Sequence, residues 1–228
     1  MSRRAPFAGQ IADRIREMIV HGDLQPDSRV VERALCEQLA VSRTPLREAL
    51  KLLQAEGLVT LHQNRGARVT SFTAEQALTL FEVISGIEGL AAELACVRMS
   101  EIELASIEEL HTKMKSHFEL GEKEPYFELN SQIHDRIVQV SNNVELIAIH
   151  SNLLLRARRG RYMAIVDPRR WNEAMEEHEA LMRAFRIRDP DLAGTVWRTH
   201  LRHTGETVGQ VMTYANTLAG STLPTEFA

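Results

Sequence analysis

Residues 41–57, VSRTPLREALKLLQAEG, carry two kinds of side chain on what we predict to be one helix. The basic side chains recur once per turn, at Arg43, Arg47 and Lys51. The apolar ones form a separate stripe, made by Leu46, Leu50 and Leu53. A proline is tolerated in the first turn of a helix, and Gly57 suits its end. On this helix we expect the leucine face to pack inward and the basic face to stay exposed.

Short helices and strands are expected on either side of this stretch. Apolar residues at helical spacing predict one helix through Ile11 and Ile19 and a second over residues 31–39. After the third helix, two short strands over 58–61 and 67–70 flank a polar turn that contains a glycine. Three short helices followed by a β-hairpin predict a winged helix-turn-helix, in which the third helix enters a DNA major groove.

The distribution of charge favours the same interpretation. Residues 1–72 hold 11 Lys/Arg and 8 Asp/Glu, a balance of +3, whereas residues 73–228 hold 16 and 23, a balance of −7. Arginine at the start of the third helix can bind guanine O6 and N7 with two hydrogen bonds. We therefore expect a DNA-binding domain over residues 1–72 and a second domain over 73–228. The alternative for an isolated basic helix is an ordinary solvated face.

Residues 11–70 resemble the winged helix-turn-helix of the GntR family of bacterial regulators, most clearly in VSRTPLREAL (41–50) and QAEGLV (54–59). The resemblance implies a transcriptional regulator that binds double-stranded DNA. Carried over by motif, the residues expected to contact the DNA are Arg33, Arg43, Thr44, Arg47, Arg65 and Gly66. Of these, Gly66 at the tip of the wing would approach the minor groove.

Beyond residue 73 we find helical stripes and no strand alternation. We expect helices over residues 75–98, 101–120, 125–141, 143–163, 171–187 and 190–218. Ser100 is a predicted helix cap, and Asp-Pro pairs mark two of the breaks. The chain is thus predicted to be mainly α, with a winged helix-turn-helix followed by an all-α antiparallel helical bundle.

Four polar side chains in this bundle have the spacing of a metal site. Asn130 and His134 are four residues apart and share a helix face. His178 and His200 each lie eleven residues from Asp189, near the turn between their helices, so an antiparallel pair brings them level. Three imidazoles and an amide oxygen that converge in a bundle would suit a divalent metal. The alternative is that these histidines are hydrogen-bonded core residues.

The bundle resembles the FCD ligand-binding domain of the FadR-type GntR branch, in which an Asp or Asn four residues before a His, together with two later His, holds a metal. The resemblance implies a zinc, nickel or manganese ion at Asn130, His134, His178 and His200, and a small organic acid as effector. Asn130 stands where many family members have Asp, and an amide binds a cation less strongly than a carboxylate.

The resemblance is incomplete in the first bundle helix. Family members commonly carry an Arg about one turn before a glutamate, where this chain reads ISGIE at residues 84–88. We expect Arg156 and Arg159 to bind the effector in its place. Arginines spaced this closely are also typical of a solvated patch.

The sequence favours a cytoplasmic, ligand-responsive repressor that binds a palindromic operator as a homodimer, with no membrane partner. No apolar run approaches the roughly 20 residues that cross a bilayer, and Cys36 and Cys96 form neither a CxxC pair nor a disulfide framework. One alternative is a bundle that only dimerises, and another is a metal-dependent hydrolase. We expect no enzyme, because Met182 stands where a zinc-protease pattern beginning at His178 requires a second His.

Overall fold

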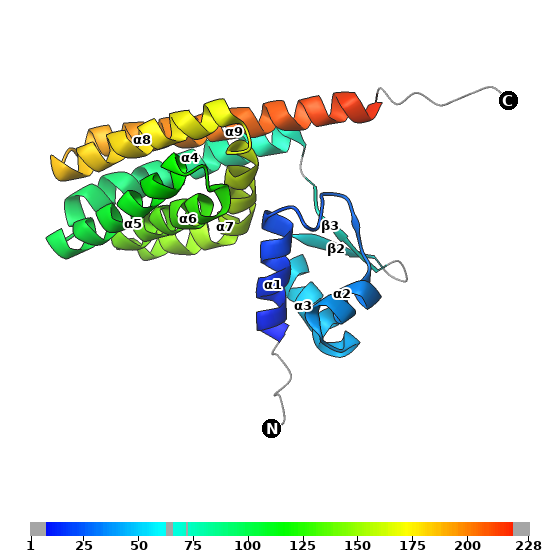
Figure 1. Cartoon of the computed structure of the whole chain (residues 1–228). Helices are drawn as coiled ribbons and strands as arrows, with labels where there is room; N and C mark the ends of the chain where they lie inside the picture. Colours follow the sequence, from blue (N-terminus) through cyan, green and yellow to red (C-terminus); the bar gives the residue numbers. More distant parts are fainter. Residues whose placement is uncertain (1–7, 63–65, 72, 221–228) are drawn as a thin grey trace. The chain divides into compact units, whose positions relative to one another are not determined.

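The computed structural model describes residues 8–62, 66–71 and 73–220, with the backbone alone from 215 to 220. The chain divides into two compact units, Met1–Phe72 and Thr73–Ala228 (Figure 1). Each unit has its own buried apolar residues.

The first unit combines helices with a small antiparallel sheet. Its elements are α1 (Ala8–Val20), β1 (Arg29–Val30), α2 (Glu32–Leu39), α3 (Arg43–Ala55), β2 (Val59–His62) and β3 (Gly66–Val69). The strand order is β1-β3-β2, with Arg29 opposite Arg68 and Leu61 opposite Ala67. The β2–β3 hairpin is the predicted wing. The sequence did not predict β1, because two residues are too few to show a period of two.

The leucine stripe of α3 lies in the core of the first unit. Leu46, Leu50 and Leu53 are at most 1% exposed, as is Ile11 on the facing helix α1. Fully burying one such side chain contributes about 1.5–3 kcal/mol. A tight turn at Ala40, whose φ is +54°, joins α2 to α3. The inward face of α3 is therefore the leucine face, and its basic residues remain available outside.

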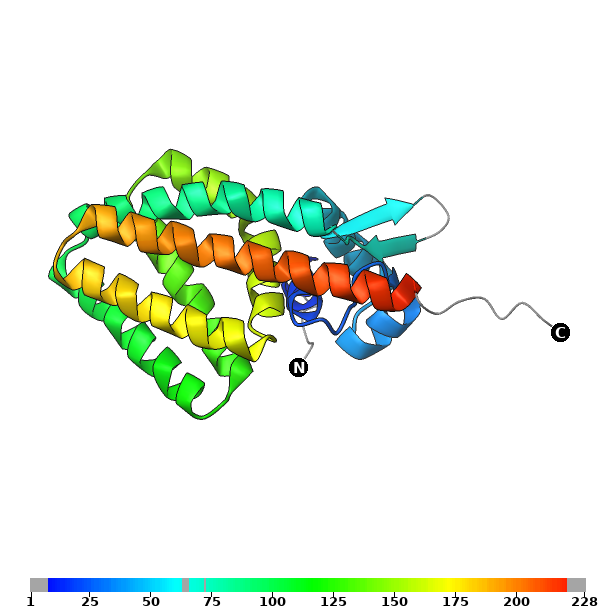
Figure 2. The same ribbon diagram turned by 90° about the horizontal axis from the view of Figure 1, so that it is seen from above.

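In the described part of the second unit, all regular secondary structure is helical. Its elements are α4 (Ala74–Arg98), α5 (Glu101–Glu119), α6 (Lys123–Val140), α7 (Val144–Ala164), α8 (Pro168–Arg186) and α9 (Pro190–Gly220). The helix α9 lies along α4 and beside α8 (Figure 2), while α6 and α7 pack against α4, and α5 packs against α6 and α8. The expected all-α bundle is confirmed. Among the described residues, no helix combines the length and the apolar character needed to span a membrane.

Side-chain caps set the starts of several bundle helices. The predicted cap at Ser100 is confirmed, because its hydroxyl accepts from the backbone N–H of Glu103 at 3.3 Å. Asp167 caps α8 in the same manner. The helices α6 and α8 begin two and three residues earlier than expected. Proline loses little in a first helical turn, so Pro125 and Pro168 lie inside these helices.

Candidate nucleic-acid interface and candidate metal centre

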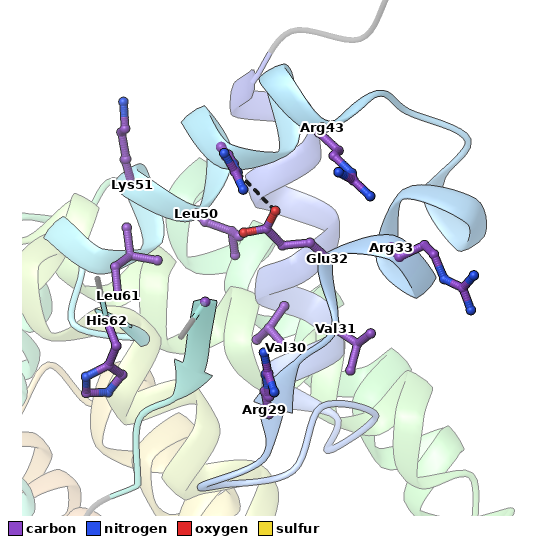
Figure 3. Close-up of a pocket in the computed structure, with 12 residues that line it drawn as sticks. Arg29, Val30, Val31, Glu32, Arg33, Arg43, Leu50, Lys51, Leu61 and His62 are labelled. Carbon is purple, nitrogen blue, oxygen red and sulfur yellow. Dashed lines mark hydrogen bonds and ion pairs between the residues drawn. The ribbon is translucent and has the colours of Figure 1, made fainter. Parts of the chain in front are cut away.

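A basic groove of about 730 Å³ lies among α2, α3 and the sheet of the first unit (Figure 3). Its basic lining residues are Arg29, Arg33, Arg43, Arg47, Lys51 and His62. Val30, Leu50 and Leu61 contribute apolar lining. Glu32 is the one carboxylate among the described residues that line it. The groove gathers cationic side chains from separate elements, which is the arrangement that DNA phosphates and base edges require.

The α3 helix presents Arg43, Thr44 and Arg47 on exposed positions of its first turns. The Nε of Arg47 donates to Oε2 of Glu32 at 3.0 Å, although the Arg47 side chain is 64% exposed. Arg33 on α2 is 81% exposed and lies 4.0 Å from a carboxylate oxygen of Glu37. Exposed pairs of this kind contribute less than about 1 kcal/mol. Both guanidinium groups can therefore exchange their carboxylates for a phosphate or a base edge.

The wing contributes Gly66 at the start of β3, with a φ of +80° that favours glycine. Apart from its chain neighbours, no atom of the described residues lies within 4 Å of the place where a Cβ would stand, so on that side the backbone is open to close approach. Arg65, the neighbouring predicted contact, lies outside the described residues. The sequence did not identify Arg29 or His62 as groove residues. The pairing of His62 with Gly66 across the hairpin is the feature that could have indicated one of them.

Three buried histidines converge in the second unit: His134 on α6, His178 on α8 and His200 on α9. Their candidate ligand nitrogens all lie within 4.8 Å of one another. The ring centroids of His178 and His200 are 4.9 Å apart, as their equal distance from the α8–α9 turn predicts. Asn130, one turn before His134, is buried and lines a small cavity with His200. The helix packing thus gathers the predicted metal ligands in one region of the bundle.

The histidine side chains fit a divalent metal. Both ring nitrogens of His178 and the Nε2 of His134 are buried without a hydrogen-bond partner in the described part of the chain. Burial, followed by the charge of Arg161, lowers the pKa of His134 to about 3. Burial also lowers the pKa values of His178 and His200. The imidazoles are therefore neutral near pH 7, the form that binds zinc or nickel, and a metal would satisfy the orphaned nitrogens.

Two glutamates orient two of these histidines. Glu88 on α4 accepts from Nδ1 of His134 at 2.6 Å, and Glu177 on α8 accepts from Nδ1 of His200 at 2.8 Å. A proton held on Nδ1 leaves Nε2 as the ligand atom. Burial raises the pKa of each carboxyl, but the histidine contacts outweigh it, holding the pKa of Glu88 well below its usual value and that of Glu177 at about 2. Sequence spacing did not identify either glutamate, because each contacts a histidine on another helix.

Arginines other than the two predicted to bind the effector line the cavity beside the histidines. Arg156 and Arg159 lie on α7, the first half-buried and the second buried. Neither is among the described residues that line the cavity next to Asn130, which has a volume of about 10 Å³. Arg161 and Arg170, each at most 2% exposed, line that cavity instead. Only the packing of α7 decides which of its closely spaced arginines points toward the histidines.

Both units match known families. Residues 7–69 match the family described as bacterial regulatory proteins, gntR family, and residues 79–203 match the FCD domain. A Bacillus subtilis protein described as the uncharacterized HTH-type transcriptional regulator YdhC is 26% identical over 93% of this chain and 95% of its own length. The HTH-type transcriptional repressor RspR of Escherichia coli is 25% identical over 90% of each chain.

A solved structure shares the fold of this chain. The structure titled E. coli McbR/YncC covers 95% of this chain and 100% of its own, with a TM-score of 0.74 at 22% identity. The matched families and relatives are transcriptional regulators and not enzymes, and the helix-turn-helix of this family binds DNA. This chain belongs to the gntR family of bacterial regulatory proteins, with an FCD domain following its winged helix-turn-helix in the sequence.

Proposed function

We propose that this protein is a dimeric repressor of the FadR-type branch that binds a palindromic operator, and that a small organic acid bound beside a metal in the bundle changes its affinity for that DNA. The basic groove of the first unit is the single observation that carries the DNA-binding part. Repression is proposed because the relative RspR is named as a repressor.

In the proposed complex, the start of α3 enters the major groove. Arg43 and Arg47 are exposed there and can reach base edges, while Arg33 on the neighbouring helix is placed to bind phosphate. The open backbone at Gly66 would let the wing approach the minor groove. A dimer would present two such heads to half-sites about 34–36 Å apart, or a multiple of that spacing.

The bundle supplies the proposed sensor. Asn130, His134, His178 and His200 would hold the divalent ion, and when bound this ion offers a coordination position to a carboxylate. All four side chains are neutral ligands, so the charge of the ion would remain for an anion to balance. Such binding changes DNA affinity only if the anion binds two arrangements of the protein unequally.

Footprinting on the DNA upstream of the protein's own gene tests the DNA-binding part. We expect one protected segment with inverted-repeat symmetry. A separate measurement of the protein's mass in solution should give the mass of a dimer. Protection of arbitrary sequence without symmetry, or a monomer that protects a single half-site, would count against the dimeric operator complex.

Thermal unfolding tests the metal part. Since a ligand that binds only the folded state raises the melting temperature, removing the ion with a chelator should lower it and adding zinc or nickel should restore it. A melting temperature that ignores both treatments would leave the histidines as core residues. The control variant is His117→Ala, which removes a histidine outside the cluster and should leave the response to chelator and metal unchanged. His117 lies on α5 and pairs with Glu122.

A further inference from the structure

The outer face of the small sheet in the first unit carries exposed polar and basic side chains. Val59, Ala67 and Val69 are at most 1% exposed and point into the core, so the residues that alternate with them point outward. The exposed residues of this outer face are Arg29, Thr60, His62 and Arg68. None of them is a carboxylate, and in the described part of the chain neither arginine forms an ion pair with one.

The two arginines of this face are directly opposed. Arg29 on β1 pairs with Arg68 on β3, and like charges placed opposite each other on one face of a sheet destabilise it. Charged residues on an edge strand prevent pairing with other chains, which would account for Arg29. That reason does not apply to Arg68, because β3 is the middle strand of the order β1-β3-β2. The opposed arginines therefore indicate an anion that binds at this face.

Both guanidinium groups have donors to offer to such an anion. Nη1 of Arg68 donates to the backbone oxygen of Asp27, which holds the side chain in place. A guanidinium has five N–H donors, so most of those on Arg68 remain for a ligand. Arg29 lines the basic groove beside it, on the same side as His62 (Figure 3). The cationic face of the sheet is thus continuous with one wall of that groove.

The position of the groove indicates which part of the DNA would meet this wall. In the proposed complex α3 enters a major groove, and the open backbone at Gly66 approaches the neighbouring minor groove. One sugar-phosphate strand separates two neighbouring grooves of a duplex, so that strand has to cross between α3 and the wing. In this unit the space between them is the basic groove of about 730 Å³, with Lys51 on the α3 side and Arg29 on the sheet side.

We propose that the outer face of the sheet, through Arg29 and Arg68, binds neighbouring phosphates of the DNA strand that separates the major groove from the minor groove. This inference rests on the DNA-binding part of the proposed function and adds to it a second contact surface, distinct from α2, α3 and the tip of the wing. The ligand is the phosphodiester backbone, which these arginines recognise by charge and not by base sequence. Such contacts fix the register of α3 on the duplex.

Titration of a random-sequence duplex with the full-length protein at several salt concentrations tests the number of phosphates bound. The logarithm of the binding constant falls with the logarithm of the salt concentration by about 0.9 for each neutralised phosphate. In Arg29→Gln and in Arg68→Gln we expect the slope to fall by about 0.9, and the affinity at about 0.15 M salt to fall roughly 5-fold, for each head that contacts the DNA. The matched control is Arg14→Gln, an exposed cation on α1 of the same unit, which should change neither quantity.

Uncharged methylphosphonate linkages locate the contact on the DNA. They are placed one at a time in a duplex from upstream of the protein's own gene. For the wild-type protein, a linkage in the strand between the two grooves should weaken binding. For Arg29→Gln or Arg68→Gln the same linkage should weaken binding no further, because a contact that is already lost cannot be lost twice. Arg29→Lys and Arg68→Lys keep the charge and should keep a salt slope near that of the wild type.

An unchanged salt slope in both glutamine variants, or linkage effects that simply add to those of the substitutions, would overturn this assignment. Circular dichroism checks the fold of every variant. If a glutamine variant is unfolded, the linkages decide with the wild-type protein, since the absence of a sensitive linkage between the two grooves would equally overturn it.

The outcome can be separated from that of the proposed function. A preference for the upstream duplex that persists, with a wild-type salt slope in both glutamine variants, would remove this phosphate-binding face and leave the operator-binding regulator intact. A reduced slope on random duplex in both variants of a protein that shows no preference for the upstream duplex would do the reverse.

Discussion

At the scale of single residues, pairs of opposite charge have different consequences in the two units. Arg47 and Glu32 form an exposed pair that DNA can replace at little cost. Glu88 is fully buried with His134, where a pairing partner cannot be exchanged for water. Exposure therefore separates a side chain that is free to bind a partner from one that orients a ligand.

Replacing arginines of the groove should separate base reading from phosphate binding. Arg47→Ala should cost about 1–3 kcal/mol of operator binding and relax the preference at one base pair, because a bidentate base contact is lost. Arg33→Ala should weaken binding to all DNA sequences alike and reduce the salt dependence of binding. Binding to a library of operator variants measures both. The control is Lys113→Ala, an exposed cation on α5, and identical base preferences in all three variants would contradict the assigned roles.

Replacing the glutamate that orients His200 should weaken the metal site. Glu177→Gln removes the carboxylate that accepts from Nδ1 of His200. Loss of such a partner typically lowers metal affinity 10- to 100-fold. Competition with a metal indicator measures the affinity. Glu173→Gln, one turn earlier on α8 and paired with Arg169, is the control, and equal effects of the two substitutions would show that Glu177 does not orient a ligand.

At the scale of elements, close helix packing depends on glycines that the sequence pattern did not single out. Gly160 on α7 and Gly205 on α9 both face Phe81 on α4. A Cβ added at Gly160 would lie 2.4 Å from the ring of Phe81, and one added at Gly205 would lie 2.5 Å from the Cβ of Phe81. Gly86, also on α4, has no atom of the described residues beyond its own stretch of helix backbone within 4 Å of the place of a Cβ. The same residue type thus permits close approach at two places and only weakens the helix at a third.

Alanine at these glycines should have effects of opposite sign. Gly160→Ala and Gly205→Ala should destabilise the bundle by about 1–3 kcal/mol, because the ring of Phe81 has to move in the first variant and its Cβ, with the α4 backbone, in the second. Gly86→Ala should stabilise it by about 0.5–1 kcal/mol, since alanine favours an exposed helix position. Urea unfolding with unchanged slope measures each value. Stabilisation by Gly160→Ala would show that α7 and α4 lie further apart than described.

Predictions from the sequence succeeded for helices with a long run of regularly spaced apolar residues and were less complete elsewhere. The helices of the bundle, the stripe of α3 and the cap at Ser100 follow from spacing and capping chemistry that neighbouring residues carry. The strand β1 was missed because it has only two residues and its partner β3 lies some forty positions away. Glu88 was missed as the partner of His134, and Arg161 and Arg170 were missed as cavity residues. Each contacts a residue on another helix, and only tertiary packing brings them together.

At the scale of the whole molecule, the proposed function divides the work of a regulator between the two units. The first carries a surplus of positive charge and an open groove, and the second carries buried, neutral imidazoles beside paired glutamates and arginines. A bundle that needed only to dimerise would not require orphaned nitrogens in its interior, since apolar residues of the same volume pack at least as well. That contrast is the physical reason to regard the second unit as a sensor.

The central claim, that the groove of the first unit recognises a specific operator, is tested most directly by fluorescence anisotropy. A labelled duplex from upstream of the protein's own gene is titrated at about 0.15 M salt against an excess of random duplex. We expect a preference on the order of 10³-fold or more for the upstream duplex, largely lost in Arg43→Ala combined with Arg47→Ala. Equal affinity for both duplexes, with and without zinc and a small organic acid such as acetate, would contradict the account.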